Sequence, residues 1–369
     1  MGLRCDGVAR RALVAAITAA ILLAACGGGD SDDDRNAPAR AQPLLGVTSG
    51  AVLSEGAPLR AEVQAMKASG VTALRAPFYW WTAQPTKGAP NFAATDPLVE
   101  AVSRAGIELL PIAVGTPPWA ARHPKLRNSP PAGTKTYAAF MTALIGRYGP
   151  SGSFWTEHPR VPKLPVRHWQ LWNEPDHLHY WSDQPYAADY VKLTRAARKA
   201  IKEADPGATV VMAGFADRSW DAIAAVYRAG GKGVFDAVAI HPYTFEVSNV
   251  LRIVEYARRA LRRAGDAERP LWLTEVTWSS GKRPGHTPAP FETTPADQAA
   301  RLAEALPLLI RRRKQLGVER IFWENWLSND SNHANPFDFS GLRVLHPDGS
   351  VTEKPAFAEF KRIALDQQR

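Results

Sequence analysis

Short apolar runs and longer amphipathic segments alternate along this chain from residue 44 to its end. The short runs are rich in Val, Ile, Leu and aromatic residues, which is typical of buried β-strands. In the longer segments apolar residues recur with a helical period, with Arg, Lys and Glu between them. We expect strands at 44–49, 71–78, 107–115, 166–174, 208–214, 235–243, 270–278 and 320–326. We expect helices at 58–69, 96–105, 134–148, 186–204, 220–229, 249–264, 295–316 and 354–365.

The order of these segments predicts an α/β fold. The strands are apolar throughout, so they are expected to be parallel and covered by helices on the outside. Eight strands close a (β/α)8 barrel, the TIM barrel, which commonly has about 250 residues. A doubly wound open sheet is the alternative, but the first strand-to-helix turn, TSGAVLSEG, lacks the G-x-G-x-x-G spacing of a phosphate-binding loop. We predict a single barrel domain over 42–369.

The chain before this domain has another pattern. Arg4, Arg10 and Arg11 precede a short apolar run that extends from Ala12 to Ala24. A membrane-spanning helix needs about 20 apolar residues, whereas a shorter run behind a basic stretch is typical of a secretory signal. We therefore predict a signal peptide and an exported protein.

The predicted signal peptide, residues 1–25, ends in the sequence LAA and is followed by Cys26. This junction resembles the lipobox of bacterial lipoproteins, in which the cysteine becomes the lipid-carrying first residue after cleavage. The resemblance implies lipidation of Cys26 and anchoring to a membrane of the bacterial cell envelope. The Gly/Asp/Ser-rich stretch 26–41 would be a flexible tether. The alternative is an ordinary secretory signal with a chance cysteine.

Cysteine content and charge exclude several classes of protein. Besides Cys26 the chain has only Cys5, so a domain over 42–369 can hold no disulfide, thiol nucleophile or Cys-ligated metal. The net charge of +9 falls to +7 without residues 1–25, which contain three Arg and one Asp. The remaining basic residues alternate with acids on predicted helices, as in RAARKAIKEA. This pattern is typical of solvated helix faces, and we expect no nucleic-acid partner.

Polar residues gather at the predicted carboxyl ends of the strands, where (β/α)8 barrels carry their active sites. They are Arg75, Asn173, Glu174, His241, Tyr243, Glu275, Trp323, Glu324, Asn325 and Trp326. Singly, each has an ordinary explanation, such as a salt bridge for Arg75 or a core position for His241. Together they indicate a site, because Glu174 and Glu275 come from strands three βα units apart.

Two carboxyl groups that face each other are the requirement of retaining glycoside hydrolysis. One is protonated and acts as the acid, and the other attacks the anomeric carbon from about 5–5.5 Å away, against about 6.5–9.5 Å in inverting enzymes. Donation from Arg75 and Tyr243 would keep Glu275 anionic as the nucleophile, and Glu174 would be the acid and base. Asn173 is placed to donate to the sugar 2-hydroxyl.

This set of residues resembles the motifs of glycoside hydrolase clan A. The residues are Arg75, Asn173-Glu174-Pro175, His241-Pro242-Tyr243, Glu275 and Trp323. The stretch from FYWWTAQPTKG to TPPW and the ending FSGLRVLHPDGSVTEKPAFAEFKRI are similar to the same regions of family 39 and its relatives. The resemblance implies a retaining enzyme with Glu174 as acid/base, Glu275 as nucleophile and no cofactor. It also implies sugar contacts from Arg75, Asn173, His241, Tyr243 and Trp323.

One departure from family 39 concerns size. Its exo-acting members carry an accessory β-sandwich, for which this chain has no room, so the resemblance is to smaller endo-acting enzymes of bacterial exopolysaccharide systems. Those bind internal sugars in an open groove. The 12 Trp residues suit such a role, since sugar rings stack on their faces. We expect Trp81 and Trp119 to bind sugar, and Tyr79, Trp80, Trp181, Trp278 and Trp326 are further candidates for the groove.

The sequence thus predicts a monomer whose partners are a carbohydrate and, through Cys26, a membrane. No metal site is expected, because His177 and His179 lack a clear third ligand. Two other hypotheses are a non-catalytic glycan-binding lipoprotein and a divalent-metal barrel enzyme. The paired glutamates argue against the first, and the second predicts that a chelator abolishes activity.

Overall fold

The computed structural model describes residues 44–54, 56–285, 289 and 291–369. The predicted signal peptide, Cys26 and the tether lie outside these residues, and their assignment stays a prediction. Gln42–Arg369 form one compact unit. None of the described helices is both long enough and apolar enough to cross a membrane.

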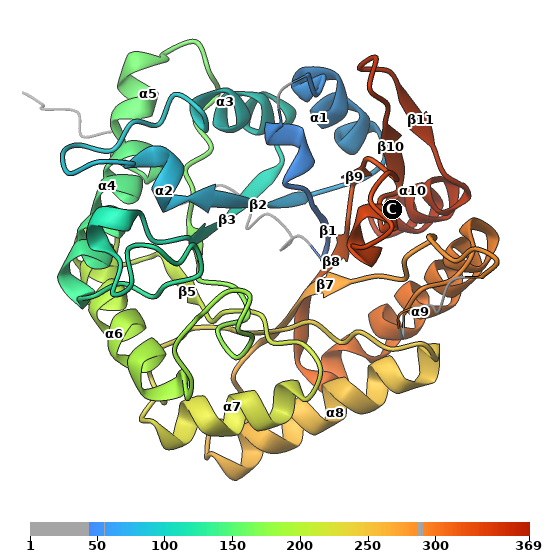
Figure 1. Cartoon of the computed structure of the whole chain (residues 1–369). Coiled ribbons are helices and arrows are strands. Elements are labelled where there is room, and N and C mark those ends of the chain that lie inside the picture. Colours follow the sequence, from blue (N-terminus) through green and yellow to red (C-terminus); the bar gives the residue numbers. More distant parts are fainter. Residues whose placement is uncertain (1–43, 55, 286–288, 290) are drawn as a thin grey trace, which may run out of the picture. The chain divides into compact units, whose positions relative to one another are not determined.

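Eight parallel strands form the centre of this unit (Figure 1). They are β1 (Leu45–Thr48), β2 (Ala73–Tyr79), β3 (Glu108–Val114), β4 (His168–Leu171), β5 (Thr209–Val211), β6 (Val238–Ile240), β7 (Leu271–Val276) and β8 (Val318–Glu324). Their order is β5-β4-β3-β2-β1-β8-β7-β6. Single parallel bridges, Val211 to Ala237 and Phe215 to Ile240, connect the two ends of this order. The predicted (β/α)8 barrel is therefore confirmed.

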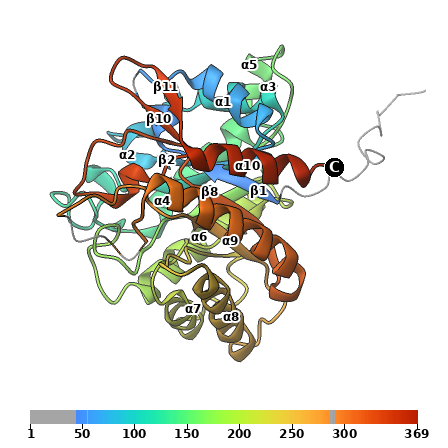
Figure 2. The same ribbon diagram turned by 90° about the vertical axis from the view of Figure 1, so that its right-hand side faces the viewer.

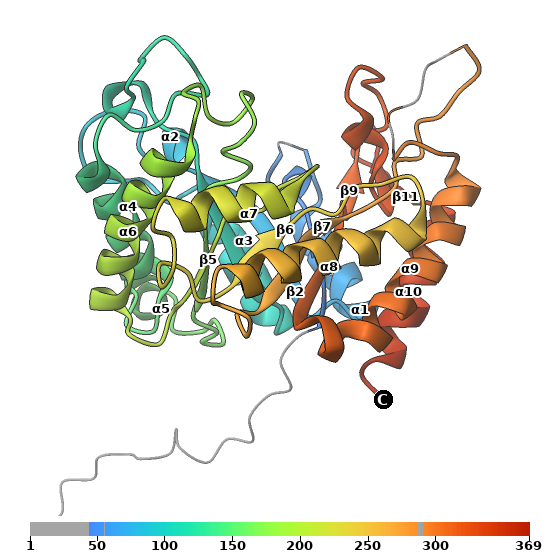
Figure 3. The same ribbon diagram turned by 90° about the horizontal axis from the view of Figure 1, so that it is seen from below.

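Helices surround the strands on the outside (Figures 1 and 3). They are α1 (Leu59–Ala68), α2 (Trp80–Ala83), α3 (Asp96–Ala105), α4 (Thr134–Tyr148), α5 (Ser153–Glu157), α6 (Ala187–Ala204), α7 (Ser219–Arg228), α8 (Val247–Arg263), α9 (Pro295–Leu316) and α10 (Pro355–Asp366). Each expected helix overlaps one of these. In Figure 3, α7 and α8 lie side by side across the front of the barrel.

Local sequence explains where these elements begin and end. Helix α9 starts at Pro295, and proline suits this first position because the backbone N–H that it lacks would have no partner within the helix. The preceding residue, Thr294, caps the helix: its hydroxyl accepts a hydrogen bond from the Asp297 amide. The helix ends at Gly317, whose left-handed backbone (φ 63°) suits glycine. Inside the barrel, Gly46 has no room for a side chain, because a Cβ atom there would lie 2.6 Å from Phe322. The Phe322 ring thus fills the space beside Gly46.

The strand expected at 166–174 is shorter than predicted. It ends at Leu171, since Trp172 and Glu174 have left-handed backbone angles, with φ of 73° and 38°. Such angles are unfavourable for residues with a side chain and occur where surrounding structure enforces them, often at functional sites. The turn is held by two hydrogen bonds, from the Trp172 amide to the Ala113 carbonyl and from the Glu174 amide to the Gly214 carbonyl.

The sequence pattern also missed a small sheet after β8. It consists of β9 (Leu327–Ser328), β10 (Arg343–Leu345) and β11 (Val351–Glu353), and Figure 2 shows β10 and β11 above α10. One ion pair and several buried hydrogen bonds attach this segment to the barrel. Glu62 of α1 binds the Arg343 guanidinium at 3.0 Å and accepts from the Trp326 indole at 2.9 Å. The Lys354 ammonium, which follows β11, donates to the Ser280 hydroxyl beyond β7 at 3.0 Å. These contacts fix the loop between β9 and β10 beside the mouth of the barrel.

Candidate active site

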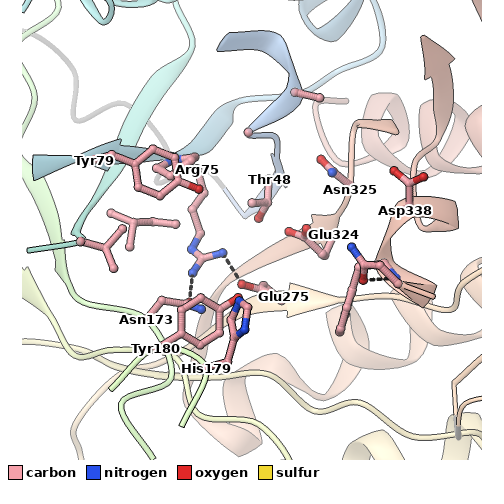
Figure 4. A pocket seen from close by; sticks show the side chains of 18 of the residues that line it. Thr48, Arg75, Tyr79, Asn173, His179, Tyr180, Glu275, Glu324, Asn325 and Asp338 are labelled. Carbon is pink, nitrogen blue, oxygen red and sulfur yellow. Dashed lines mark hydrogen bonds and ion pairs between the residues drawn. The ribbon is translucent and has the colours of Figure 1, made fainter. Parts of the chain in front are cut away.

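A cavity of about 690 Å³ opens at the carboxyl ends of the strands (Figure 4). Its wall is formed by the ends of β1, β2, β3, β7 and β8, by the turn after β4 and by the loop between β9 and β10. The polar or aromatic lining residues include Thr48, Arg75, Tyr79, Trp81, Arg127, Asn173, His179, Tyr180, Glu275, Glu324, Asn325 and Asp338. The barrel therefore brings together residues that are up to about 290 positions apart in the chain (Thr48 and Asp338).

Arg75 holds the floor of this cavity together. Only 1% of the residue is exposed, and all three nitrogens of its guanidinium are used. Nε donates to Gln170 at 2.6 Å, Nη1 to Glu275 at 2.7 Å and Nη2 to the side-chain oxygen of Asn173 at 2.9 Å. Charge-assisted bonds of this kind are strong and directional. They fix the relative positions of β2, β4 and β7 in the site.

Glu275 is arranged to be ionised. Besides the bond from Arg75, its second oxygen accepts a hydrogen bond from the Tyr243 hydroxyl. Burial raises the pKa of this carboxyl, but the charges of His241 and Arg75 and the hydrogen bond from Tyr243 outweigh burial and lower the pKa below its usual value. Donors to the charged form favour that form. Glu275 is therefore a carboxylate at neutral pH.

Glu174 contacts His241, which lies beneath it and is fully buried. Nδ1 of His241 is 2.6 Å from the Glu174 carboxyl, and Nε2 is 3.0 Å from the Thr274 hydroxyl and 3.4 Å from Glu275. The imidazole thus bridges the two glutamates. Gly214 makes room for it, because a Cβ atom at this position would lie 1.9 Å from Nε2 of His241.

The two glutamates face each other at short range. One oxygen of Glu174, one of Glu275 and a nitrogen of His241 all lie within 4.8 Å of one another. So short a distance between oxygens fits the separation of the two carboxyl groups in retaining enzymes, about 5–5.5 Å. In inverting enzymes the two groups are about 6.5 Å or more apart, which leaves room for a water molecule. Three such ligands can also bind a metal ion, but the guanidinium of Arg75 already occupies the oxygen of Glu275 that faces His241. A fixed positive charge there opposes the binding of a cation.

The structure brings together most of the expected site residues. Hydrogen bonds join Arg75 to Asn173 and Glu275, Tyr243 to Glu275, and His241 to Glu174. The contact of 3.4 Å between Nε2 of His241 and Glu275 connects these two groups of residues. Trp81 lines the cavity, stacked on Tyr79 with ring centres 4.9 Å apart. It lies against Gly115, where a Cβ atom would be 2.2 Å from its ring.

Two of the expected sugar-binding tryptophans lie elsewhere. Trp323 is fully buried behind the wall, donates from its indole to the Ser340 carbonyl at 3.3 Å and does not line the cavity. Trp119 is half-buried, donates to the Gln84 carbonyl at 2.9 Å and also lies outside the cavity lining. Trp80, Trp181, Trp278 and Trp326 are core residues as well. Most of the tryptophans therefore stabilise the fold.

Several lining residues were not among the expected catalytic or sugar-binding residues, although the sequence placed Glu324 and Asn325 at a polar strand end. Glu324 and Asn325 replace Trp323 at the cavity wall, and His179 and Tyr180 reach it from the loop after β4. The sequence FWENW already indicated a role for Glu324, because a charged residue at the end of an apolar strand is costly to bury unless it has a partner or a function. The side chain that faces the cavity is set by the alternation along β8, where Trp323 and Glu324 point in different directions.

Comparison with known proteins gives a likeness of fold. No family model and no curated protein sequence matches the chain. Among solved structures, a family 39 glycoside hydrolase from Bacteroides cellulosilyticus WH2 has 19% identity and a TM-score of 0.61, covering 88% of this chain and 64% of that one. A family 39 β-xylosidase from Caulobacter crescentus has 22% identity and a TM-score of 0.60, covering 88% and 71%. A family 51 α-L-arabinofuranosidase from Bifidobacterium longum has 15% identity and a TM-score of 0.60, covering 88% of this chain and 74% of that one. The chain thus spans about two thirds of the length of these structures.

Proposed function

We propose that this protein is a retaining glycoside hydrolase that cleaves β-glycosidic bonds of a polysaccharide or oligosaccharide. The proposal depends on the facing pair Glu174 and Glu275. One oxygen of each carboxyl group lies within 4.8 Å of the other, and the two groups have different hydrogen-bond partners. Arg75 and Tyr243 keep one member charged, whereas the other lies against an imidazole. The likeness in fold to glycoside hydrolases of families 39 and 51 supports the proposal.

The first step forms a covalent intermediate. The Glu275 carboxylate attacks the anomeric carbon while the carboxyl of Glu174 transfers its proton to the glycosidic oxygen, and the bond to the leaving sugar breaks. Arg75 and Tyr243 hold the attacking group in place, and their hydrogen bonds to it weaken as the carboxylate gives an electron pair to the new bond and loses its charge. The side-chain amide of Asn173 is oriented by its bond from Arg75, which leaves its nitrogen free to donate to a sugar hydroxyl.

The second step returns the enzyme to its starting state. The leaving sugar departs, and water takes its place beside Glu174, which is now a carboxylate and accepts a proton from the water. The oxygen of that water attacks the anomeric carbon, and the bond to Glu275 breaks. Two displacements on the same carbon preserve its configuration. Neither step requires a cofactor.

Product configuration is the most direct test. We expect proton NMR of a fresh reaction with a β-linked oligosaccharide to show the β-anomer of the new reducing end first, before mutarotation. An added chelator is expected to leave the rate unchanged. Release of the α-anomer first would contradict the retaining mechanism, loss of the rate with chelator would support the metal-dependent alternative, and binding without any release would support a glycan-binding protein.

We further propose that Cys26 carries lipid and anchors the enzyme in the bacterial cell envelope. The proposal rests on the sequence LAAC after a short apolar run and on the tether-like composition of 26–41. Wild-type protein is expected in the membrane fraction, and Cys26→Ala protein in the soluble exported fraction. If the Cys26→Ala protein stays with the membrane as the wild type does, the lipid anchor is refuted.

A further inference from the structure

The cavity holds a third carboxyl group that the proposed mechanism does not use. Glu324 is the last residue of β8 and pairs in register with Thr48 of β1. Its side chain is partly exposed and lines the cavity, and Figure 4 shows it beside Glu275. A carboxyl group next to a catalytic carboxylate is costly to place, since two negative charges at short range repel each other.

Among the residues that the structure describes, no cation forms an ion pair with Glu324; Arg127, which also lines the cavity, lies over the Trp81 ring at 5.1 Å from its centre. The three nitrogens of Arg75 are taken by Gln170, Glu275 and Asn173. The imidazole of His241 is taken by Glu174 and Thr274. One oxygen of Glu324, Oε2, is buried and has no hydrogen-bond partner among the residues that the structure describes. An ionised carboxylate would leave that oxygen without compensation for its charge.

The groups around Glu324 favour its neutral form. Burial raises the pKa of this carboxyl well above its usual range, and the negative charge of Glu275 adds to the rise, as does that of Glu174 whenever Glu174 is ionised. Arg75 and a hydrogen bond from Thr48 oppose the rise without cancelling it. The hydroxyls of Tyr79, Tyr180 and Tyr243 also interact with it, and the pKa of each is raised, so they are uncharged at neutral pH.

We propose that Glu324 is a neutral carboxylic acid that donates a hydrogen bond to an oxygen of the sugar bound against Glu275, and that the site therefore selects an uncharged sugar. The proton belongs on Oε1, because Oε2 is buried without a partner and only the exposed part of the side chain can reach a ligand. Asn325, the next residue, lines the same wall and adds an amide beside it. This inference names the substrate class and rests on the proposed glycosidase function.

The preference for an uncharged sugar follows from hydrogen-bond chemistry. A hydroxyl can accept from a carboxylic acid and donate to another group, whereas an ammonium group can only donate. An amino sugar would therefore leave the Glu324 proton unused unless that carboxyl ionised beside Glu275. A uronic acid whose carboxylate lay beside Glu275 and Glu324 would add a further negative charge there, because the guanidinium of Arg75 is already fully occupied and Arg127, the other arginine in the cavity lining, lies over the Trp81 ring. Neutral sugars avoid both costs.

Infrared spectroscopy tests the protonation state without reference to activity. At pH 8 we expect a carbonyl band of a neutral carboxylic acid that is lost in Glu324→Gln and kept in Glu174→Gln. Asp176 does not interfere, because burial raises the pKa of this residue only to about 6. If Glu324→Gln removes no such band, the inference is overturned, whether or not the protein hydrolyses glycosides.

Kinetics test the selection of the sugar. With matched aryl β-glycosides, we expect turnover of a neutral sugar and much weaker turnover of the 2-amino sugar and the uronic acid. Glu324→Ala should lower kcat/KM for the neutral glycoside by about tenfold, the value of one hydrogen bond to a bound ligand, while Glu324→Gln, which keeps a donor, should lose far less. Equal losses in the two variants, or a preference for the amino sugar, would overturn the inference. Absence of turnover with every glycoside would instead refute the glycosidase function, and the infrared band would still decide the state of Glu324.

Discussion

Glu275→Gln is expected to lower kcat by at least about 10⁴-fold, because an amide cannot form the covalent bond to the anomeric carbon. The substitution preserves shape, and the amide oxygen can still accept from Arg75, so the fold is expected to remain intact. The rate of release of reducing ends, measured with wild-type and variant protein on the same oligosaccharide, gives the ratio. Equal rates would remove Glu275 from the mechanism and with it the glycosidase assignment.

The pH dependence of the wild-type enzyme offers an independent measurement on the same residue. The nucleophile must be ionised, so activity is lost as the pH falls through the pKa of Glu275. That pKa lies below the usual value of 4.5, because the His241 and Arg75 charges and the Tyr243 hydroxyl outweigh burial. We therefore expect kcat/KM to remain flat down to pH values below 4.5. In Tyr243→Phe, which loses one donor to Glu275, the acid limb should move to higher pH.

Glu174→Ala is expected to lower kcat/KM on an unactivated oligosaccharide by about 10²- to 10⁴-fold, the usual contribution of a general acid. The reason is that the leaving sugar then departs as an alkoxide. For an aryl glycoside, whose phenol leaves without protonation, the same substitution should lower kcat/KM much less. A comparison of the two substrates therefore separates a general acid from a residue that only shapes the site.

Rescue by a small anion completes the test of Glu174. Azide does not need a general base, and it can enter the space left by the carboxyl group, so it should restore turnover of the aryl glycoside by Glu174→Ala and yield a β-glycosyl azide. Glu275→Gln serves as the matched control, because azide cannot replace the nucleophile with retention. If azide fails to accelerate Glu174→Ala, or if both substrates lose activity equally, Glu174 is not the acid and base.

Much of the fold was predictable from local pattern. Parallel barrel strands are apolar on both faces, and the helices between them carry one apolar stripe, so each βα unit has a recognisable period. The predictions were less accurate where backbone conformation depends on distant residues. Trp172 and Glu174 end β4 early in left-handed conformations that the hydrogen bonds to Ala113 and Gly214 hold in place. The short strands β9 to β11 lack a recognisable pattern of their own, and contacts with distant residues, such as the ion pair of Glu62 with Arg343, attach them to the barrel.

For the site, the chemical types were predictable and the orientations were not. Polar residues at apolar strand ends identified Arg75, Asn173, Glu174, His241, Tyr243 and Glu275, because burial of such groups requires partners. The sequence also contained Glu324, but its neighbour Trp323 fitted the expected pattern of sugar stacking better. The structure places Trp323 in the core and Glu324 on the cavity wall.

The amino-acid sequence by itself determined that this chain forms a barrel and that two glutamates end strands on facing sides of it, since both follow from periods and spacings along the chain. The sequence also predicted Arg75 and Tyr243 as the donors to Glu275, whereas only the tertiary structure decided the neighbours of Glu174 and Glu324. Arg75 and Tyr243 converge on Glu275 from β2 and from beyond β6, His241 lies against Glu174, and no donor other than Thr48 approaches Glu324 among the described residues. Because the charge of a carboxyl group depends on burial and on its nearest donors and not on its place in the sequence, the roles of the three glutamates differ although their side chains are identical.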